Sequence, residues 1–250
     1  MKKTALVTGV TSGIGLATAR KLHAAGFRII GTGRNLEALN KLSAELGDAF
    51  LPLNYDVTDC KATEESVRSI PAEWSEIDVL VNNAGLALGL EPEFEGSLDD
   101  WFTMIDTNIK GLLHMTRLIV PGMIERGRGH IINVGSVAGD AAYANGAVYC
   151  ATKSAVKTIT DGLRIDLVNT PLRVTLVKPG LVETNFSKVR FHGDEERADN
   201  VYKGITPLTG DDIADTIVYA VQAPAHVQIA ELLVLATYQG SGSVIARQPV

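Results

Sequence analysis

Cysteine is scarce in this chain, which excludes a framework of disulfide bonds. The 250 residues contain only Cys60 and Cys150, and the two do not form a Cys-x-x-Cys pair. Such usage is typical of a reducing compartment, where both side chains are expected to pack as small residues. The sequence therefore predicts a cytoplasmic protein.

Long apolar runs and basic blocks are also absent. The apolar segment near the start is too short for the hydrophobic region of a signal peptide, and no later run has the length of a bilayer span. The 23 basic and 29 acidic residues give a formal net charge of -6, and the basic residues form no block. We expect neither a membrane nor a nucleic acid as a partner.

The histidines do not have the spacing of metal ligands. They show no i, i+4 pairing with one another and no motif typical of a metal site. The five are His23, His114, His130, His192 and His226. We expect no metal site.

No Pro/Ser-rich linker, internal repeat or low-complexity tract marks a domain boundary. The chain has 46% hydrophobic and 21% charged residues, a composition typical of a globular protein able to bury a sizeable core. We expect a single domain over residues 1–250.

Short apolar runs alternate with segments of helical character. The runs are Ala5–Thr8, Arg28–Gly31, Ala49–Leu53, Val79–Val81, His130–Val134, Arg173–Val177 and Leu232–Leu235. This alternation predicts parallel strands joined by helical crossovers, and the absence of polar alternation predicts helices on both faces of the sheet. The expected fold class is α/β, doubly wound, with a seven-stranded parallel sheet.

One stretch between two predicted strands breaks this rhythm. Residues 183–206 contain many charged side chains and few apolar anchors. We interpret the stretch as a substrate lid, with a solvated helical insert as the alternative.

A glycine-rich loop follows the first predicted strand and precedes a helix whose Leu16, Ala19 and Leu22 face inward. The loop reads Gly9, Val10, Thr11, Ser12, Gly13, Ile14 and Gly15. Glycines let the backbone approach a pyrophosphate, the helix N-terminus holds the anion, and the two hydroxyls add donors. A plain capping turn would look similar, but the first βα turn of a doubly wound sheet favours a dinucleotide site.

No acidic residue ends the second predicted strand, where Arg34 and Asn35 follow Gly33. The guanidinium of Arg34 can bind a 2′-phosphate that no carboxylate repels, so NADP(H) is favoured over NAD(H). The alternative is an exposed Arg34 that only precedes the next helix. Asp56 and Val57 can contact the adenine, although an Asp-x-Thr helix cap would look the same.

Tyr149 and Lys153 lie four residues apart and share one face of a predicted helix. An adjacent ammonium and a positively charged nicotinamide would stabilise the phenolate, which makes the tyrosine a usable proton donor and acceptor. A lone pair at this spacing often arises by chance. Ser136, at the end of a predicted strand, can hold a substrate oxygen beside the phenol or can simply cap a turn.

Two asparagine-containing segments complete the candidate site residues. Asn82–Gly85 ends the fourth predicted strand, where its amides can bridge backbone groups and Gly85 gives room for the nicotinamide ribose. Asn108 lies inside a helical pattern from Leu98 to Met123, either as a surface residue or lining a path that relays protons from Lys153 to solvent.

In combination these motifs resemble the short-chain dehydrogenase/reductase family over essentially the whole chain. The resemblance rests on Thr8–Gly15, Asn82–Gly85, Asn108, Ser136, Tyr149, Lys153, Pro179–Gly180 and Thr184. It implies a Rossmann fold in which Tyr149 is the acid/base, Lys153 lowers its pKa and holds the ribose, Ser136 orients the substrate and Asn108 anchors a proton relay. It also implies a homo-oligomer, a tetramer.

The cofactor contacts expected in such a protein form one set. They are Gly9, Thr11, Ser12, Gly13, Ile14, Gly15, Arg34, Asn35, Asp56, Val57, Asn83, Ala84, Gly85, Tyr149, Lys153, Pro179, Gly180, Val182 and Thr184.

Within this family the chain resembles more closely one subgroup, the NADP-dependent 3-hydroxy acid dehydrogenases, which act on serine, L-allo-threonine or malonic semialdehyde. The segments that carry this similarity are Asn82–Gly89, Met104–Asn108, Phe186–Gly193 and Pro224–Val227. The implied reaction is reversible oxidation of a 3-hydroxyl, with Ser136, Tyr149 and Arg190 contacting the substrate. Arg190, Lys188 and, more weakly, His192 are candidates to bind its carboxylate. The alternatives are a reductase of other carbonyls and a non-catalytic dinucleotide-binding protein.

Overall fold

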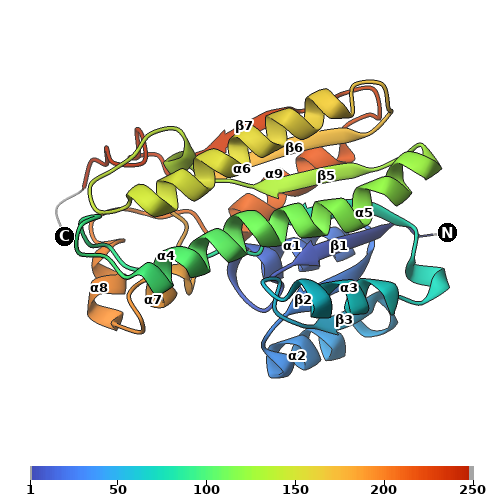
Figure 1. Cartoon of the computed structure of the whole chain (residues 1–250), viewed down its shortest axis with the longest axis horizontal. Coiled ribbons are helices and arrows are strands. Elements are labelled where there is room, and N and C mark those ends of the chain that lie inside the picture. Colours follow the sequence, from blue (N-terminus) through green and yellow to red (C-terminus); the bar gives the residue numbers. More distant parts are fainter. Residues whose placement is uncertain (1, 248–250) are drawn as a thin grey trace.

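A seven-stranded parallel sheet lies at the centre of the molecule (Figure 1). The computed structural model describes residues 2–247, and its strands lie within one or two residues of the predicted ends. They are β1 Thr4–Thr8, β2 Arg28–Gly33, β3 Phe50–Asn54, β4 Ile77–Asn82, β5 His130–Val134, β6 Arg173–Pro179 and β7 Glu231–Val234. The order is β3-β2-β1-β4-β5-β6-β7, and every neighbouring pair is parallel, as predicted.

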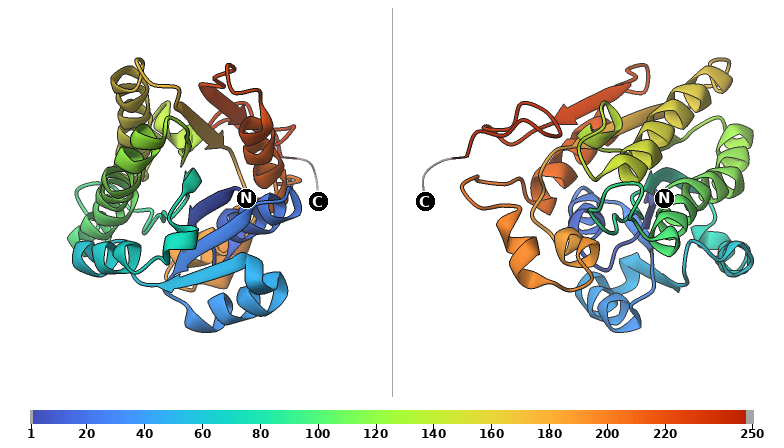
Figure 2. Two further views of the ribbon diagram at one scale, coloured as in Figure 1. Left: turned by 90° about the vertical axis from the view of Figure 1, so that its right-hand side faces the viewer. Right: turned by 60° about the vertical axis from the view of Figure 1, so that its left-hand side comes forward.

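Helices cover both faces of this sheet (Figure 2). They are α1 Gly13–Ala24, α2 Leu36–Leu46, α3 Cys60–Arg68, α4 Leu98–Ile105, α5 Leu112–Arg126, α6 Ala147–Asp166, α7 Phe186–Arg190, α8 Glu195–Asn200 and α9 Gly210–Gln222. Ala5 and Val7 of β1 pack in a cluster with side chains of α1, α2 and α9, whereas Leu6 packs with α3, α5 and α6. The structure therefore confirms the doubly wound prediction.

The order of the strands creates a crevice between β1 and β4. From β1 the chain adds β2 and β3 on one side of the sheet, and then returns to add β4 on the other side. In doubly wound sheets a ligand binds at such a reversal, outside the carboxyl ends of the strands.

The helix expected from Leu98 to Met123 is interrupted. It runs as α4, then a π-helical segment at Asp106–Gly111, then α5, which ends at Arg126. A π-helical turn takes in an extra residue and locally rotates the side chains, a change that apolar periodicity does not reveal. Asn108 lies within this π-helical segment.

Residues 183–206 leave the sheet and form the two short helices α7 and α8, drawn in orange beside α4 in Figure 1. The N–H of Gly89, in the loop after β4, donates to the carbonyl of Arg190 at 2.9 Å. The stretch is therefore packed against the loop that connects β4 to α4. Its action as a lid stays a prediction.

Across residues 2–247, the structure contains no helix that is both long and apolar enough to cross a membrane.

His130, the first residue of β5, is buried in the sheet. Its Nε2 lies 2.8 Å from Oγ1 of Thr175, and because that hydroxyl donates to the carbonyl of Ile229, Nε2 carries the proton and donates. Its Nδ1 has no partner within the described residues. Burial, reinforced by the charge of Arg173, lowers the pKa of His130 from 6.5 to about 3.

This histidine makes stability depend on pH. Because its folded pKa lies below its unfolded pKa, the unfolded chain binds a proton first as the pH falls below 6.5. We expect the free energy of unfolding to lose about 2 kcal/mol from this group between pH 6.5 and pH 5. Urea unfolding of the parent protein and of His130→Leu at pH 7 and pH 5 measures this loss. If the free energy of unfolding depends on pH equally in the two proteins, His130 is not its source.

Candidate active site

A cavity of about 490 Å³ opens at the carboxyl ends of the strands. Its walls include residues that directly follow β1, β4, β5 and β6, together with side chains of α6 and α7. In the part of the chain that the structure describes, the predicted catalytic and cofactor-binding residues line this cavity, except Gly15, Asn35 and Asn108.

The glycine-rich loop has the shape expected of a phosphate cradle. Gly9 and Gly13 adopt positive φ values of 73° and 53°, which favour glycine. A Cβ on Gly15 would lie 2.1 Å from the carbonyl oxygen of Gly9, so Gly15 supports the loop from behind without lining the cavity. Ser12 precedes α1 in an extended conformation and does not cap it, which leaves the first N–H groups of α1 available to an anion. These residues fit a dinucleotide pyrophosphate.

Side-chain hydrogen bonds join the end of β1 to the end of β4. Oγ1 of Thr8 accepts from the N–H groups of Asn83 and Ala84 at 3.0 and 2.9 Å. Nδ2 of Asn83 in turn donates to the carbonyl of Thr8 at 2.8 Å. As predicted for this segment, the amide of Asn83 bridges backbone groups and fixes the floor of the crevice.

Arg34 has an acidic neighbour that the sequence around it does not show. Its Nη1 lies 3.2 Å from Oδ2 of Asp56, which follows β3. Burial favours a raised pKa for Asp56, but bonds from the N–H and hydroxyl of Thr58 and the charge of Arg34 outweigh it and lower that pKa. The absence of an acid at the end of β2 therefore does not leave Arg34 unpaired.

At the same end of the cavity, Asp56 and Asn35 make contacts that differ from those predicted for them. The Asp-x-Thr pattern forms a turn through Oδ1 of Asp56, but the residue that caps α3 is Asp59. The side chain of Asn35 accepts from the N–H of Ala38 and caps α2. Asn35 was expected to contact the cofactor, and its oxygen is instead engaged by this helix.

Ser136, Tyr149 and Lys153 meet at the opposite end of the cavity. Ser136 lies near enough to Tyr149 to oppose the rise in the pKa of its phenol, and the Ser136 hydroxyl accepts from the N–H of Ala138 at 3.1 Å and donates to the carbonyl of Pro179 at 3.5 Å. Ser136 therefore caps a turn close to the tyrosine. Nζ of Lys153 donates to the carbonyl of Val134 at 3.0 Å and lies 6.0 Å from the centre of the Tyr149 ring.

Burial dominates the electrostatics of this cluster. It raises the pKa of Tyr149, an effect that the nearby Tyr143 strengthens and that Ser136 and Arg190 oppose. It also lowers the pKa of Lys153 to about 8. The phenol is thus neutral at pH 7, and two cations lie near its ring: Cζ of Arg190 at 5.7 Å and Nζ of Lys153 at 6.0 Å from the ring centre. The predicted effect of Lys153 on the phenol stays a prediction.

Asn108 is buried, which excludes the surface alternative. Its Oδ1 accepts from the N–H of Leu86 at 2.9 Å, and its Nδ2 donates to the carbonyl of Leu86 and to Oγ1 of Thr152 at 2.8 and 3.0 Å. The side chain thus ties the loop after β4 to α6. A Cβ on Gly85 would lie 3.2 Å from Oδ1 of Asn108 and 3.4 Å from Nζ of Lys153, so only glycine fits comfortably there.

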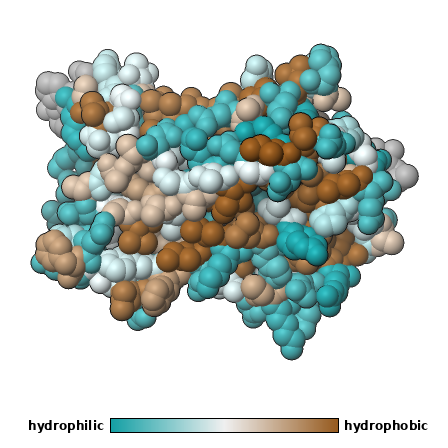
Figure 3. All heavy atoms as spheres, turned by 45° about the horizontal axis from the view of Figure 1, so that its top comes forward, coloured by the Kyte–Doolittle hydropathy of each residue, from teal (hydrophilic) through white to brown (hydrophobic). Residues whose placement is uncertain are grey.

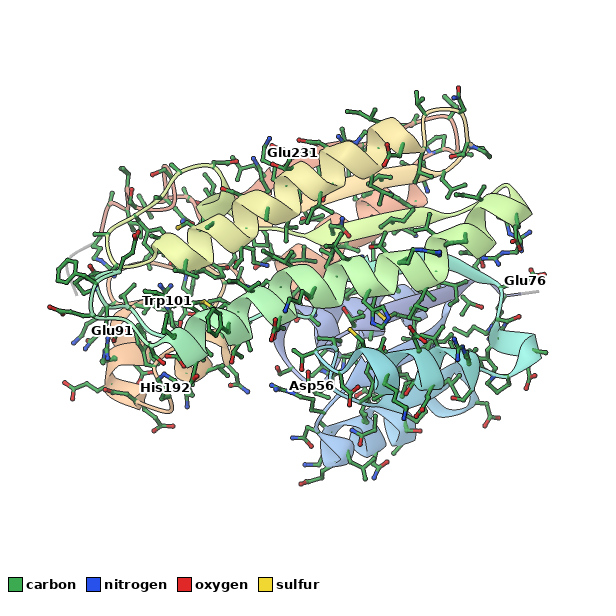
Figure 4. All side chains as sticks on the ribbon, in the orientation of Figure 1. Asp56, Glu76, Glu91, Trp101, His192 and Glu231 are labelled. Carbon is green, nitrogen blue, oxygen red and sulfur yellow. The ribbon has the colours of Figure 1, made fainter. Side chains whose placement is uncertain are left out.

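Of the three cations proposed to bind a substrate carboxylate, only Arg190 reaches the cavity within residues 2–247. Lys188 pairs with Glu195 at 2.8 Å, and His192 pairs with Asp100 at 3.0 Å. Figure 4 shows His192 at the end of the molecule near α7, below Trp101 of α4. Lys188 and His192 are therefore engaged outside the cavity, which overturns their candidacy.

Several lining residues could not be predicted from the sequence, and Tyr143 and Gln239 are two that make polar contacts at the cavity. Tyr143 lies in the loop before α6, and its hydroxyl accepts from Nη1 of Arg190 at 2.9 Å. Gln239, near the C-terminus, accepts from the N–H of Leu181 at 2.8 Å through its side chain. Neither belongs to a motif, and only the fold brings them to the cavity.

Comparison with known proteins gives concordant matches. The profile of the short chain dehydrogenase family matches residues 3–195. A curated relative from Salmonella typhimurium, NADP-dependent 3-hydroxy acid dehydrogenase YdfG, is 52% identical over 225 residues, which is 90% of this chain and 91% of that protein. Serine 3-dehydrogenase of Agrobacterium fabrum is 47% identical over 232 residues, 93% of each chain.

Solved structures agree with these relatives. The closed form of a serine dehydrogenase complexed with NADP+ has a TM-score of 0.94 and 46% identity, and the match covers 98% of this chain and 100% of that one. Serine dehydrogenase from Escherichia coli has a TM-score of 0.84 and 44% identity, with coverage of 95% and 99%.

Substitution of Gly15 tests the phosphate cradle. In Gly15→Ala, the new methyl group collides with the carbonyl of Gly9 and displaces the loop. We expect the Kd for NADPH, measured by fluorescence titration, to rise by about tenfold or more. Gly162→Ala is the matched control, because a Cβ there meets nothing within 4 Å and the change should stabilise α6 by about 0.5–1 kcal/mol. An unchanged Kd in Gly15→Ala contradicts the cradle.

Proposed function

Because this chain belongs to the short-chain dehydrogenase family, we propose that it is an NADP(H)-dependent oxidoreductase that reversibly oxidises the 3-hydroxyl of a small 3-hydroxy acid. The observation that carries the proposal is a cavity in which Ser136, Tyr149 and Lys153 lie beside Arg190. No carboxylate within residues 2–247 forms a salt bridge with Arg190. The names of the relatives, which specify NADP, 3-hydroxy acids and serine, support the same reading.

Proton transfer is the task of Tyr149 and Ser136. During oxidation the Ser136 hydroxyl holds the substrate oxygen, and Tyr149, as the phenolate that a neighbouring ammonium and the positively charged nicotinamide would stabilise, takes the hydroxyl proton; during reduction the neutral phenol donates that proton back. A bound nicotinamide would accept or supply the hydride at C4. Lys153 is buried near both residues, donates to the carbonyl of Val134, and would hold the nicotinamide ribose. Asn108 supports this cluster from behind through Thr152.

The charges along the cavity favour an acid without an α-amino group. In the described part of the chain, the only acidic residue that lines the cavity is Asp56, which pairs with Arg34 where the 2′-phosphate is expected. The substrate end offers the cations Arg190 and Lys153 and no carboxylate. A carboxylate gains from these cations, whereas the ammonium of serine is repelled by them. We therefore expect 3-hydroxypropionate to be a better substrate than serine.

Residues 183–206 are proposed as a lid over the substrate. Support comes from Arg190, which lies in this stretch, lines the cavity and exchanges hydrogen bonds with Gly89: its carbonyl accepts from the N–H of Gly89, and its Nε donates to the Gly89 carbonyl at 3.1 Å.

A cytoplasmic homotetramer is proposed as the working form. Large apolar side chains are exposed along α4 and α5 and at the end of α6, among them Leu98, Phe102, Leu113 and Ile165. Figure 3 shows apolar residues in an interrupted band across one face of the molecule. Burial of such a face between copies would stabilise an assembly. The free thiol of Cys60, which is exposed, fits a reducing compartment.

A substrate panel tests the proposed function. Turnover of 3-hydroxypropionate, serine, L-allo-threonine and neutral alcohols is followed by NADPH absorbance, with NAD+ and NADP+ in parallel. We expect activity on the hydroxy acids with NADP+, and a loss in kcat of about 10²–10⁴-fold in Tyr149→Phe. Activity confined to neutral alcohols or carbonyls supports the alternative reductase. Binding of NADPH without any turnover supports a dinucleotide-binding protein.

Arg190 is expected to determine affinity for acids. In Arg190→Ala the substrate carboxylate loses its charge-assisted partner, so the KM for 3-hydroxypropionate should rise by about tenfold to a hundredfold, while the KM for propanal stays within about twofold. Lys188→Ala is the control, because Lys188 pairs with Glu195 outside the cavity. If Arg190→Ala raises the KM for the acid and the KM for the aldehyde equally, Arg190 does not bind the substrate carboxylate.

Arg34 is expected to select the phosphorylated cofactor. Arg34→Ala removes the guanidinium that meets the 2′-phosphate, so the Kd for NADPH should rise by about tenfold or more and that for NADH should hardly change. Arg20→Ala, which breaks a surface pair with Glu45, is the control. Fluorescence titration with both cofactors measures the preference, and a parallel loss of both would count against this role.

A further inference from the structure

Tyr143 is a wall residue of the cavity that the proposed chemistry does not use. It lies in the loop between the 3-10 helix Val137–Gly139 and α6. Its ring packs over Gly146 so tightly that a Cβ there would lie 2.0 Å from Cε2 of the ring. Asn145, between the two, adopts a left-handed φ of 64°. The backbone of this loop is therefore shaped around the Tyr143 ring.

The hydroxyl of this ring holds the guanidinium of Arg190. It accepts from Nη1 at 2.9 Å, while Nε of Arg190 donates to the carbonyl of Gly89 at 3.1 Å. Among the residues that the structure describes, Nη2 has no hydrogen-bond partner. Because both fixed partners are neutral, the guanidinium is oriented without losing its positive charge.

The same contacts place Arg190 beside the proton-transferring phenol. Its Cζ lies 5.5 Å from the centre of the Tyr143 ring and 5.7 Å from the centre of the Tyr149 ring. Both distances are within the range of cation–π attraction. A planar cation held at two nitrogens and placed near two rings loses little further freedom when an anion binds, which favours affinity.

We propose that Tyr143 is a positioning residue for acid selection: its hydroxyl holds Arg190 next to Tyr149, so that Nη2 meets the carboxylate of the substrate. This inference rests on the proposed function. In a 3-hydroxy acid a single carbon separates the carboxylate from the carbon that bears the hydroxyl. A guanidinium that drifts from its place therefore binds the acid without bringing the hydroxyl to Tyr149, or fails to bind it. Tyr143 acts through Arg190 and takes no part in proton transfer.

Tyr143→Phe separates this role from packing. The variant keeps the ring over Gly146 and removes only the hydroxyl. We expect the KM for 3-hydroxypropionate to rise about tenfold, with kcat and the KM for propanal within about twofold of the parent values. In an Arg190→Ala background the same change should have no further effect, because its partner is gone. Tyr219→Phe on α9, where the side chain is exposed, is the matched control.

Two kinetic results overturn the proposal: an equal rise in KM for acid and aldehyde, and full additivity of Tyr143→Phe with Arg190→Ala. Binding of propionate, measured by calorimetry with and without saturating NADP+, supplies a readout that needs no turnover. If the parent protein oxidises no hydroxy acid, the proposed function fails by itself. The role of Tyr143 then stands if Tyr143→Phe binds propionate about tenfold more weakly than the parent protein, and falls if the two bind it equally or not at all.

Discussion

The hydrogen bonds of the Asn108 side chain are the constraint on which the site depends. They join both backbone groups of Leu86, in the loop after β4, to Thr152 of α6. Thr152 lies between Tyr149 and Lys153 in the sequence, and Gly85 lies against Lys153. The buried amide of Asn108 therefore fixes the position of α6 relative to the loop after β4. Loss of such an amide leaves buried polar groups without partners, at a cost of about 1–3 kcal/mol each. The reacting groups are therefore positioned by a residue outside the cavity wall.

The sequence predicts the sheet and the cradle because both depend on local patterns. Apolar runs such as His130–Val134 become strands buried on both faces, and alternation with helices implies parallel pairing. The glycines of the first loop have the conformations expected of them, with positive φ at Gly9 and Gly13. Tyr149 and Lys153 share a helix face because their spacing requires it.

Contacts between distant segments were beyond the reach of the sequence. Arg190 meets Gly89 from 101 residues away and Tyr143 from 47 residues away, and nothing local distinguishes it from Lys188 as a candidate. The pairing of Arg34 with Asp56 likewise depends on β2 and β3 lying side by side. The apolar pattern of the sequence predicted one continuous helix and did not indicate the π-helical segment that carries Asn108.

The reciprocal hydrogen bonds between Gly89 and Arg190 couple the binding of an anionic substrate to the position of the proposed lid. Arg190 is the last residue of α7, which lies within the proposed lid, so an outward movement of α7 would also withdraw the cation from Tyr143 and Tyr149. If the proposed lid opens and closes in this way, an anion bound to Arg190 would favour the closed state by its difference in affinity for the two states. Binding of the substrate carboxylate by Arg190 and exclusion of water by the proposed lid would then be one equilibrium. A neutral ligand of the same size would not shift the lid toward its closed state.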